Sequence, residues 1–223
     1  MDTYLLLVLP AVLISLWASY NVNATFKKYS KKITSSGYTA NDVARRILDS
    51  NGLYNVRIEH ISGDLTDHYD PRANVIRLSD TVDGSRSAAA IGVAAHEAGH
   101  AVQHATGYGP IKLRMAIIPI CNLGSNLAMP LVIAGIVFSF YPLAVLGIIA
   151  FATATLFQLV TLPVEFNASK RALDVLAGGY LSDDDLGASK KVLTAAALTY
   201  VAALAVSLAN LLRLVVMVNR RRR

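Results

Sequence analysis

Long apolar runs constrain the fold of this chain more than any other feature of its sequence. Hydrophobic residues make up 54% of the 223 residues and charged residues only 16%. An apolar helix of about 20 residues crosses the hydrocarbon core of a bilayer. Apolar blocks of about this length occupy residues 4–20, 115–140, 143–164 and 192–218. We therefore expect a mainly α integral membrane protein with about four hydrophobic helices.

Basic residues lie beside these blocks. The formal net charge is +6, and the lysines and arginines gather between residues 27 and 32 and at residues 220–223. Cations at the ends of apolar helices meet anionic lipid headgroups. The basicity therefore predicts contact with membrane lipids and does not argue for nucleic-acid binding. The single cysteine, Cys121, excludes an internal disulfide.

The positions of the cations also predict an orientation. Lys and Arg follow the first block, precede the second and lie between the third and the fourth, whereas the turn at Tyr141-Pro142 carries none. The positive-inside rule then places the segment after the first block in the cytoplasm of a multi-pass cell-membrane protein. Four full crossings would leave residues 220–223 outside. Either that tail departs from the rule or the last helix does not span completely.

These patterns divide the chain into five segments. Residues 1–36 are expected to be a retained anchor with a basic helical extension; a cleaved signal peptide is the alternative, but Met1-Asp2-Thr3 carries no Lys or Arg. The remaining segments are a soluble α+β segment at 37–110, a transmembrane hairpin at 111–164, a surface segment at 165–191, and a last helix with a basic tail at 192–223.

Local patterns predict both helix and strand in the soluble segment. Thr39 and Asp42 have the spacing of a capping box that opens a short helix. Residues 56–61 and 74–79 alternate between polar and apolar positions, as half-buried strands do. The second strand is either an edge that an extended peptide could join or an ordinary hairpin strand, and the sequence leaves both open.

The pattern His-Glu-x-x-His occurs at residues 96–100. On a helix, His96 and His100 lie about 40° apart, so both imidazoles project toward one point. They supply two ligands of a zinc site, and Glu97 is placed to take a proton from a water on the metal. A core helix with incidental histidines is the alternative, but such buried groups need partners. The pattern predicts a zinc metallopeptidase with one zinc ion per chain.

A third protein ligand must come from elsewhere in the chain. His104 lies about 80° around the helix from His96, so it is expected to line the site or to be exposed. Glu165, where an apolar run ends and charge resumes, is the better candidate. Alternatively, Glu165 is simply the first polar residue outside the membrane. We expect Glu165 to open a new amphipathic helix. This helix should lie next to the motif, because the transmembrane hairpin returns to the membrane surface there.

Four stretches of the sequence together resemble a known family, the YugP-type membrane zinc metallopeptidases of bacteria. They are residues 69–72, 75–79, 96–103 and 162–169, and the resemblance covers nearly the whole chain. More distantly the chain is similar to the HtpX and CAAX prenyl protease group of gluzincins. The resemblance implies a gluzincin-like zinc peptidase segment at the membrane surface. It also implies zinc binding by His96, His100 and Glu165, with Glu97 as general base.

The chain departs from the wider group at one position. An aspartate there often follows the ligand glutamate by four residues, and this chain has Ser169 instead. Candidates to orient the histidines are therefore Asn167, Ser169 and Asp174.

A group that stabilises the oxyanion is also expected, and the candidates are Arg171, Tyr69 and His68. Alternatively, His68 is an exposed loop residue and Arg171 is a cation at the membrane interface.

The expected activity is a membrane-embedded endopeptidase that hydrolyses peptide bonds of a protein or peptide substrate. A zinc-activated water attacks the carbonyl, and Glu97 transfers its proton to the leaving amine. One alternative is a non-catalytic membrane scaffold with a structural metal, although such a site is normally closed by a fourth protein ligand. A transporter is another alternative, but residues 115–164 contain no Asp, Glu, Lys, Arg or His.

Overall fold

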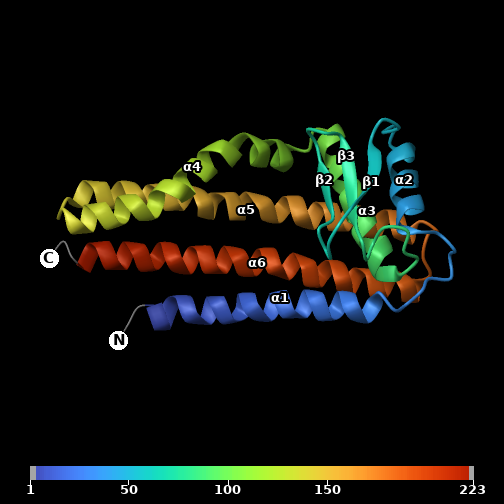
Figure 1. Cartoon of the computed structure of the whole chain (residues 1–223), viewed down its shortest axis with the longest axis horizontal. Helices are drawn as coiled ribbons and strands as arrows, with labels where there is room; N and C mark the ends of the chain where they lie inside the picture. Colours follow the sequence, from blue (N-terminus) through green and yellow to red (C-terminus); the bar gives the residue numbers. More distant parts are fainter. Residues whose placement is uncertain (1–3, 221–223) are drawn as a thin grey trace. The chain divides into compact units, whose positions relative to one another are not determined.

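Four long apolar helices dominate the computed structural model, which describes residues 4–220. Each is long and apolar enough to cross a membrane. A short π-helix at Tyr4–Val8 leads into the first. The other elements are two shorter helices and three strands (Figure 1). The prediction of a mainly α membrane protein with a small α+β segment is confirmed. Residues 1–3 and 221–223 of the expected anchor and tail lie outside the described residues.

The four long helices are listed here with their bounds: α1 Leu9–Tyr29, α4 Gly109–Val137, α5 Tyr141–Ala177 and α6 Asp183–Arg220. The chain divides into two compact units. The first comprises Met1–Ser19, Lys112–Pro163 and Leu198–Arg223, and the second comprises Tyr20–Ile111 and Val164–Ala197.

In the first unit, α4 and α5 form the predicted helical hairpin. Small residues let the two backbones approach closely, as is common between membrane helices. A Cβ atom at Gly135 of α4 would clash with the backbone nitrogen of Ala144 on α5. A Cβ at Gly147 would lie 2.7 Å from the backbone nitrogen of Val132. Any larger side chain at either glycine would therefore force the helices apart.

In the second unit, helix α2 (Ala40–Ser50) begins as predicted. Thr39 is the N-cap: its side chain accepts a hydrogen bond from the Asp42 backbone, and the Asp42 carboxylate accepts one from the Thr39 backbone. The apolar face of α2 carries Val43, Ile47 and Leu48, all buried in the core of this unit. The capping box thus fixes where a helix that packs against the motif helix begins.

The sheet contains three strands, β1 (Arg57–Ile61), β2 (His68–Asp70) and β3 (Val75–Ser79). Their order is β1-β3-β2, with β1 parallel and β2 antiparallel to β3 (Figure 1). Both predicted strands are present. The possibility that residues 74–79 form a free edge is wrong, because β3 is paired on both sides. The alternative, an ordinary hairpin strand, is confirmed, since β3 forms an antiparallel hairpin with the preceding strand β2.

The motif lies on helix α3 (Ala88–Ala105), whose N-cap is Ser87. Its small side chains pack against other elements of the second unit at very short range. A Cβ atom at Gly99 would lie 2.9 Å from the carbonyl oxygen of Ala168 on α5, and one at Gly92 would lie 3.1 Å from the Ser189 side chain on α6. The glycine inside the motif thus permits the close approach of α3 and α5.

Two predicted helix boundaries are wrong. The basic extension of the first helix ends at Tyr29 and does not continue to residue 36, because residues 32–34 pair instead with residues 86–88. Glu165 does not open a helix, since α5 runs unbroken from Tyr141 to Ala177. Its buried stripe continues past Pro163 at helical spacing through Val164, Ala168 and Ala172.

Candidate metal centre

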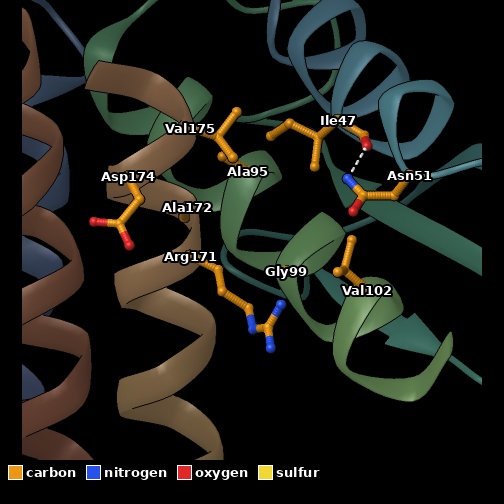
Figure 2. A pocket seen from close by; sticks show the side chains of 9 residues that line it. All are labelled: Ile47, Asn51, Ala95, Gly99, Val102, Arg171, Ala172, Asp174 and Val175. Carbon is orange, nitrogen blue, oxygen red and sulfur yellow. Dashed lines mark hydrogen bonds between the residues drawn. The ribbon is translucent and has the colours of Figure 1, made fainter. Parts of the chain in front are cut away.

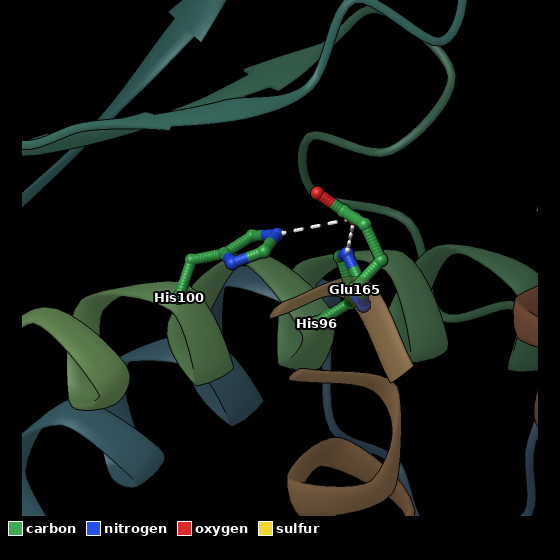
Figure 3. Close-up of side chains that lie close together, drawn as sticks. All are labelled: His96, His100 and Glu165. Carbon is green, nitrogen blue, oxygen red and sulfur yellow. Dashed lines mark ion pairs between the residues drawn. The ribbon is translucent and has the colours of Figure 1, made fainter. Parts of the chain in front are cut away.

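The two histidines of the motif project from one face of α3. Their rings meet edge to face, with centroids 4.6 Å apart and an interplanar angle of 83°. Both side chains are largely buried. This is the geometry expected from a separation of four residues on a helix. Figure 3 shows both rings directed toward α5.

Glu165 reaches the same point from α5. Its Oε2 atom lies 3.3 Å from Nε2 of His96 and 3.5 Å from Nε2 of His100 (Figure 3). The three potential ligand atoms all lie within 4.8 Å of one another, and Glu165 is only 2% exposed. Two imidazole nitrogens and one carboxylate oxygen are a donor set that suits a catalytic zinc ion. The structure thus brings together the three residues that the sequence predicted as ligands.

Glu97 lies on the turn between the two histidines and is also buried. Its Oε2 atom accepts a hydrogen bond of 2.9 Å from the backbone N–H of Tyr69 in β2. Tyr69 therefore contributes through its backbone. Its hydroxyl is directed elsewhere and donates to Asn74 at 3.4 Å. Strand β2, which the sequence did not predict, holds the Glu97 carboxylate in place.

The other ring nitrogen of each histidine also has a partner. The hydroxyl oxygen of Ser169 lies 3.1 Å from Nδ1 of His96. Nδ1 of His100 lies 3.0 Å from Oε1 of Gln103, whose amide nitrogen donates to Asn167 at 3.0 Å. Ser169 and Asn167 were predicted as orienting groups. Gln103 was missed, although its place three residues after His100 on the same helix was the available signal.

The remaining candidates lie in other surroundings. Asp174 forms an ion pair with Lys170. Arg171 donates from Nε to Asn167 at 2.8 Å and lines a cavity of about 160 Å³ beside Gly99. Figure 2 shows Arg171 extended toward α3 and Asp174 turned the other way.

Two further histidines, His68 and His104, were candidates for the site. Nδ1 of His68 lies 2.8 Å from the carbonyl oxygen of Thr66, and its Nε2 lies 3.2 Å from the Arg77 guanidinium. His104 is exposed, as expected, and its ring meets that of Tyr69 edge-on.

The electrostatics of the site act most clearly on His100. Burial lowers the pKa of this imidazole, but the carboxylates of Glu165 and Glu97 favour its charged form and outweigh burial. The pKa of His100 therefore lies above its ordinary value. A metal ion must bind the deprotonated nitrogen, so a proton and a metal would compete for His100.

Comparison with known proteins identifies the family. Residues 4–219 match the model of a family described as "Putative neutral zinc metallopeptidase". The chain belongs to this family. It is also 49% identical over 213 residues to the "Putative membrane protease YugP" of Bacillus subtilis (strain 168), with 95% of each chain covered. No solved structure matches the chain. The resemblance to the YugP-type family is confirmed.

Membership gives the site a chemical context. The description of the family names zinc and peptidase activity, and the description of the relative names a membrane protease. The described chain has four helices fit to span a membrane and one cluster of two histidines and a glutamate with the donor chemistry of a zinc site. The family thus implies a peptide substrate, and the apolar helices imply contact with lipid.

Proposed function

We propose that this chain is a membrane-embedded zinc-dependent endopeptidase. His96, His100 and Glu165 bind one zinc ion per chain, and Glu97 is the general base. The observation that carries the proposal is the convergence of three ligand atoms within 4.8 Å, with a second buried glutamate on the intervening turn of α3. Three protein ligands leave a coordination position for water or substrate, as in other catalytic zinc sites.

Zinc bound here would polarise a peptide carbonyl and lower the pKa of a water molecule toward neutrality. Glu97 would take a proton from a water molecule there as the water oxygen attacks the carbonyl carbon. The same carboxyl would then give the proton to the amine as the C–N bond breaks. The Tyr69 N–H holds Oε2 of Glu97, which restricts rotation of the carboxylate.

The sequence and the relative both support a membrane setting for the proposed enzyme. We place it in a bacterial cell membrane, with the catalytic segment in the cytoplasm, because the cations flank the spans on that side. Its partners are a protein or peptide substrate and membrane lipids. The gluzincin assignment rests on the third ligand, which is a glutamate on a later helix.

The chain offers a matched set of glutamate variants to test this function. Its three glutamates are Glu59, Glu97 and Glu165. Zinc content and cleavage of a casein substrate are measured for detergent-solubilised wild type and for each Glu→Gln variant. We expect Glu97→Gln to keep zinc and lose cleavage, and Glu165→Gln to lose both. Glu59→Gln is the control, since this residue pairs with Arg57 on the sheet.

Two outcomes would defeat parts of the assignment. Equal cleavage by wild type and Glu97→Gln would remove Glu97 as the base. Zinc binding without cleavage in the wild type, unchanged in Glu97→Gln, would favour the alternative of a non-catalytic scaffold with a structural metal.

A further inference from the structure

Gln103 is a fully buried polar side chain beside the candidate metal centre. It lies on α3, one turn beyond His100, and both ends of its amide are engaged. Oε1 lies 3.0 Å from Nδ1 of His100. Nε2 donates to the backbone oxygen of Val164 at 2.8 Å and to Oδ1 of Asn167 at 3.0 Å. A buried amide with these contacts is held in one position.

The partners of Gln103 determine which way its amide faces. A backbone carbonyl can only accept hydrogen bonds, so the group that faces Val164 must be the NH₂ end. The oxygen therefore faces His100, and an amide oxygen can only accept. Nδ1 of His100 must then carry a proton. This conclusion follows from the chemistry of the partners and does not depend on distinguishing oxygen from nitrogen by position.

Asn167 supports the same orientation from the other side. Its Oδ1 atom accepts from Nε2 of Gln103 and from Nε of Arg171 at 2.8 Å. The Nε of arginine is always a donor, so Oδ1 of Asn167 is fixed as the acceptor between them. The guanidinium of Arg171 also lies 6.0 Å from the centre of the Tyr108 ring. Arg171 thus acts at the end of a chain of hydrogen bonds that leads to His100.

We propose that Gln103 is a positioning residue that holds His100 as the Nδ1–H tautomer, with the lone pair of Nε2 directed at the metal. The inference rests on the proposed function, because it assigns Gln103 a task only if Nε2 is a ligand. Nε2 is the nitrogen that faces Glu165. A group that fixes the tautomer of a ligating histidine typically contributes a factor of about 10 to 100 in metal affinity.

The partner of the other histidine has different chemistry. His96 meets the hydroxyl of Ser169, which can either donate or accept. Ser169 can orient the ring of His96 but cannot select its tautomer. The tautomer of His100 is therefore fixed by its partner, whereas that of His96 is not. Ser169 provides a control, because it contacts the other histidine of the site at a similar distance.

The test compares Gln103→Leu, Gln103→Glu and Ser169→Ala with wild type. The first readout is the tautomer of His100 in metal-free, ¹⁵N-histidine-labelled protein, at a pH where the ring is neutral, assigned with a His100→Asn variant. The second readout is the zinc dissociation constant from chelator competition. Circular dichroism confirms that each variant is folded. Gln103→Glu keeps an acceptor for Nδ1 but removes the amide donor to Val164 and Asn167, so it separates the bond to His100 from the bonds to α5.

We expect the proton on Nδ1 in wild type, Gln103→Glu and Ser169→Ala, and on Nε2 in Gln103→Leu. The zinc dissociation constant of Gln103→Leu should rise by about 10- to 100-fold. Wild-type tautomer and affinity in folded Gln103→Leu would overturn the inference. If wild type itself neither binds zinc nor cleaves peptide, the proposed function fails instead, and the tautomer readout still reports on Gln103.

Discussion

The backbone N–H of Tyr69 donates to Oε2 of Glu97 at 2.9 Å and thereby joins β2, an edge strand of the sheet, to the middle of helix α3. Tyr69 is opposite Ile76 in the antiparallel pair of β2 and β3. Its N–H is turned away from β3 and toward the glutamate. The strand therefore donates a hydrogen bond to a side chain that is expected to take part in the chemistry.

Removing this donor should lower cleavage without unfolding the sheet. Proline lacks an N–H and is tolerated on edge strands where that group does not join the ladder. We expect Tyr69→Pro to reduce kcat by about 10- to 100-fold, because a carboxylate that is free to rotate is misplaced for proton transfer. Zinc content should stay unchanged. The measurement is steady-state cleavage of a peptide by detergent-solubilised protein.

Tyr69→Ala is the matched control, since it removes the ring but keeps the N–H. It should retain most of the wild-type kcat. If Tyr69→Ala and Tyr69→Pro lose activity equally, the side chain matters and the backbone bond does not.

The larger elements of this fold follow from the sequence because their signals are long or chemically specific. The four apolar helices are each far longer than a chance apolar run. The capping box of Thr39 and Asp42 and the spacing of His96 and His100 each depend on residues within four positions of one another. Local geometry alone fixes such features.

The missed features depend on partners far away in the chain. Strand β2 has only three residues, too few to show alternation, and it forms because β3 and Glu97 offer hydrogen-bond partners. Gln103 resembles any polar helix residue until Val164, 61 positions later, is placed beside it. The continuity of α5 through Glu165 was obscured because charge begins there, yet the buried face continues.

Bound zinc should stabilise the folded protein through its three ligands. A ligand at 100 times its dissociation constant stabilises the folded state by about 2.7 kcal/mol. For a chain of this size we expect zinc to raise the melting temperature by about 5 to 10 °C at that concentration. Glu165→Gln should abolish the shift, because one of three ligands loses its charge. Differential scanning fluorimetry with and without zinc measures the shift in melting temperature of wild type and of Glu165→Gln.

Asp174→Asn is the control for Glu165→Gln on the same helix. This residue pairs with Lys170 at the surface, so its zinc-dependent shift should equal that of wild type. An undiminished shift in Glu165→Gln would mean that another group completes the site.

The start of α2 should weaken at acid pH. Hydrogen bonds from the Thr39 side chain and backbone hold the pKa of Asp42 below its ordinary value. The folded pKa is depressed, so the stabilisation is fully present above the unfolded pKa of about 3.9 and is lost as the pH falls through the folded value. Hydrogen exchange of the α2 amides should be faster in Asp42→Ala than in wild type near pH 6.

That difference between wild type and Asp42→Ala should vanish once the pH lies below the depressed pKa of folded Asp42, where the carboxyl is protonated in both the folded and the unfolded wild type. Thr39→Ala removes the groups that depress the pKa and should show the same loss of pH dependence. A difference that persists unchanged in strong acid would show that Asp42 acts through packing and not through its charge.

Gly99 sets the distance between the helices that carry the metal ligands. A Cβ atom there would lie 2.9 Å from the carbonyl oxygen of Ala168, which is backbone and cannot rotate away. Gly99→Ala should therefore push α5 from α3 and draw Glu165 away from the histidines. We expect the zinc dissociation constant to rise at least tenfold, as for other displaced ligand supports.

A second alanine substitution separates this steric effect from helix propensity. Alanine favours a helix over glycine by up to about 1 kcal/mol, so Gly187→Ala, where a Cβ would meet nothing within 4 Å, should stabilise α6 and leave zinc affinity unchanged. At Gly99 the same gain is opposed by overpacking of about 1 to 3 kcal/mol. If Gly99→Ala binds zinc as tightly as Gly187→Ala, the short approach of α3 and α5 does not control the site.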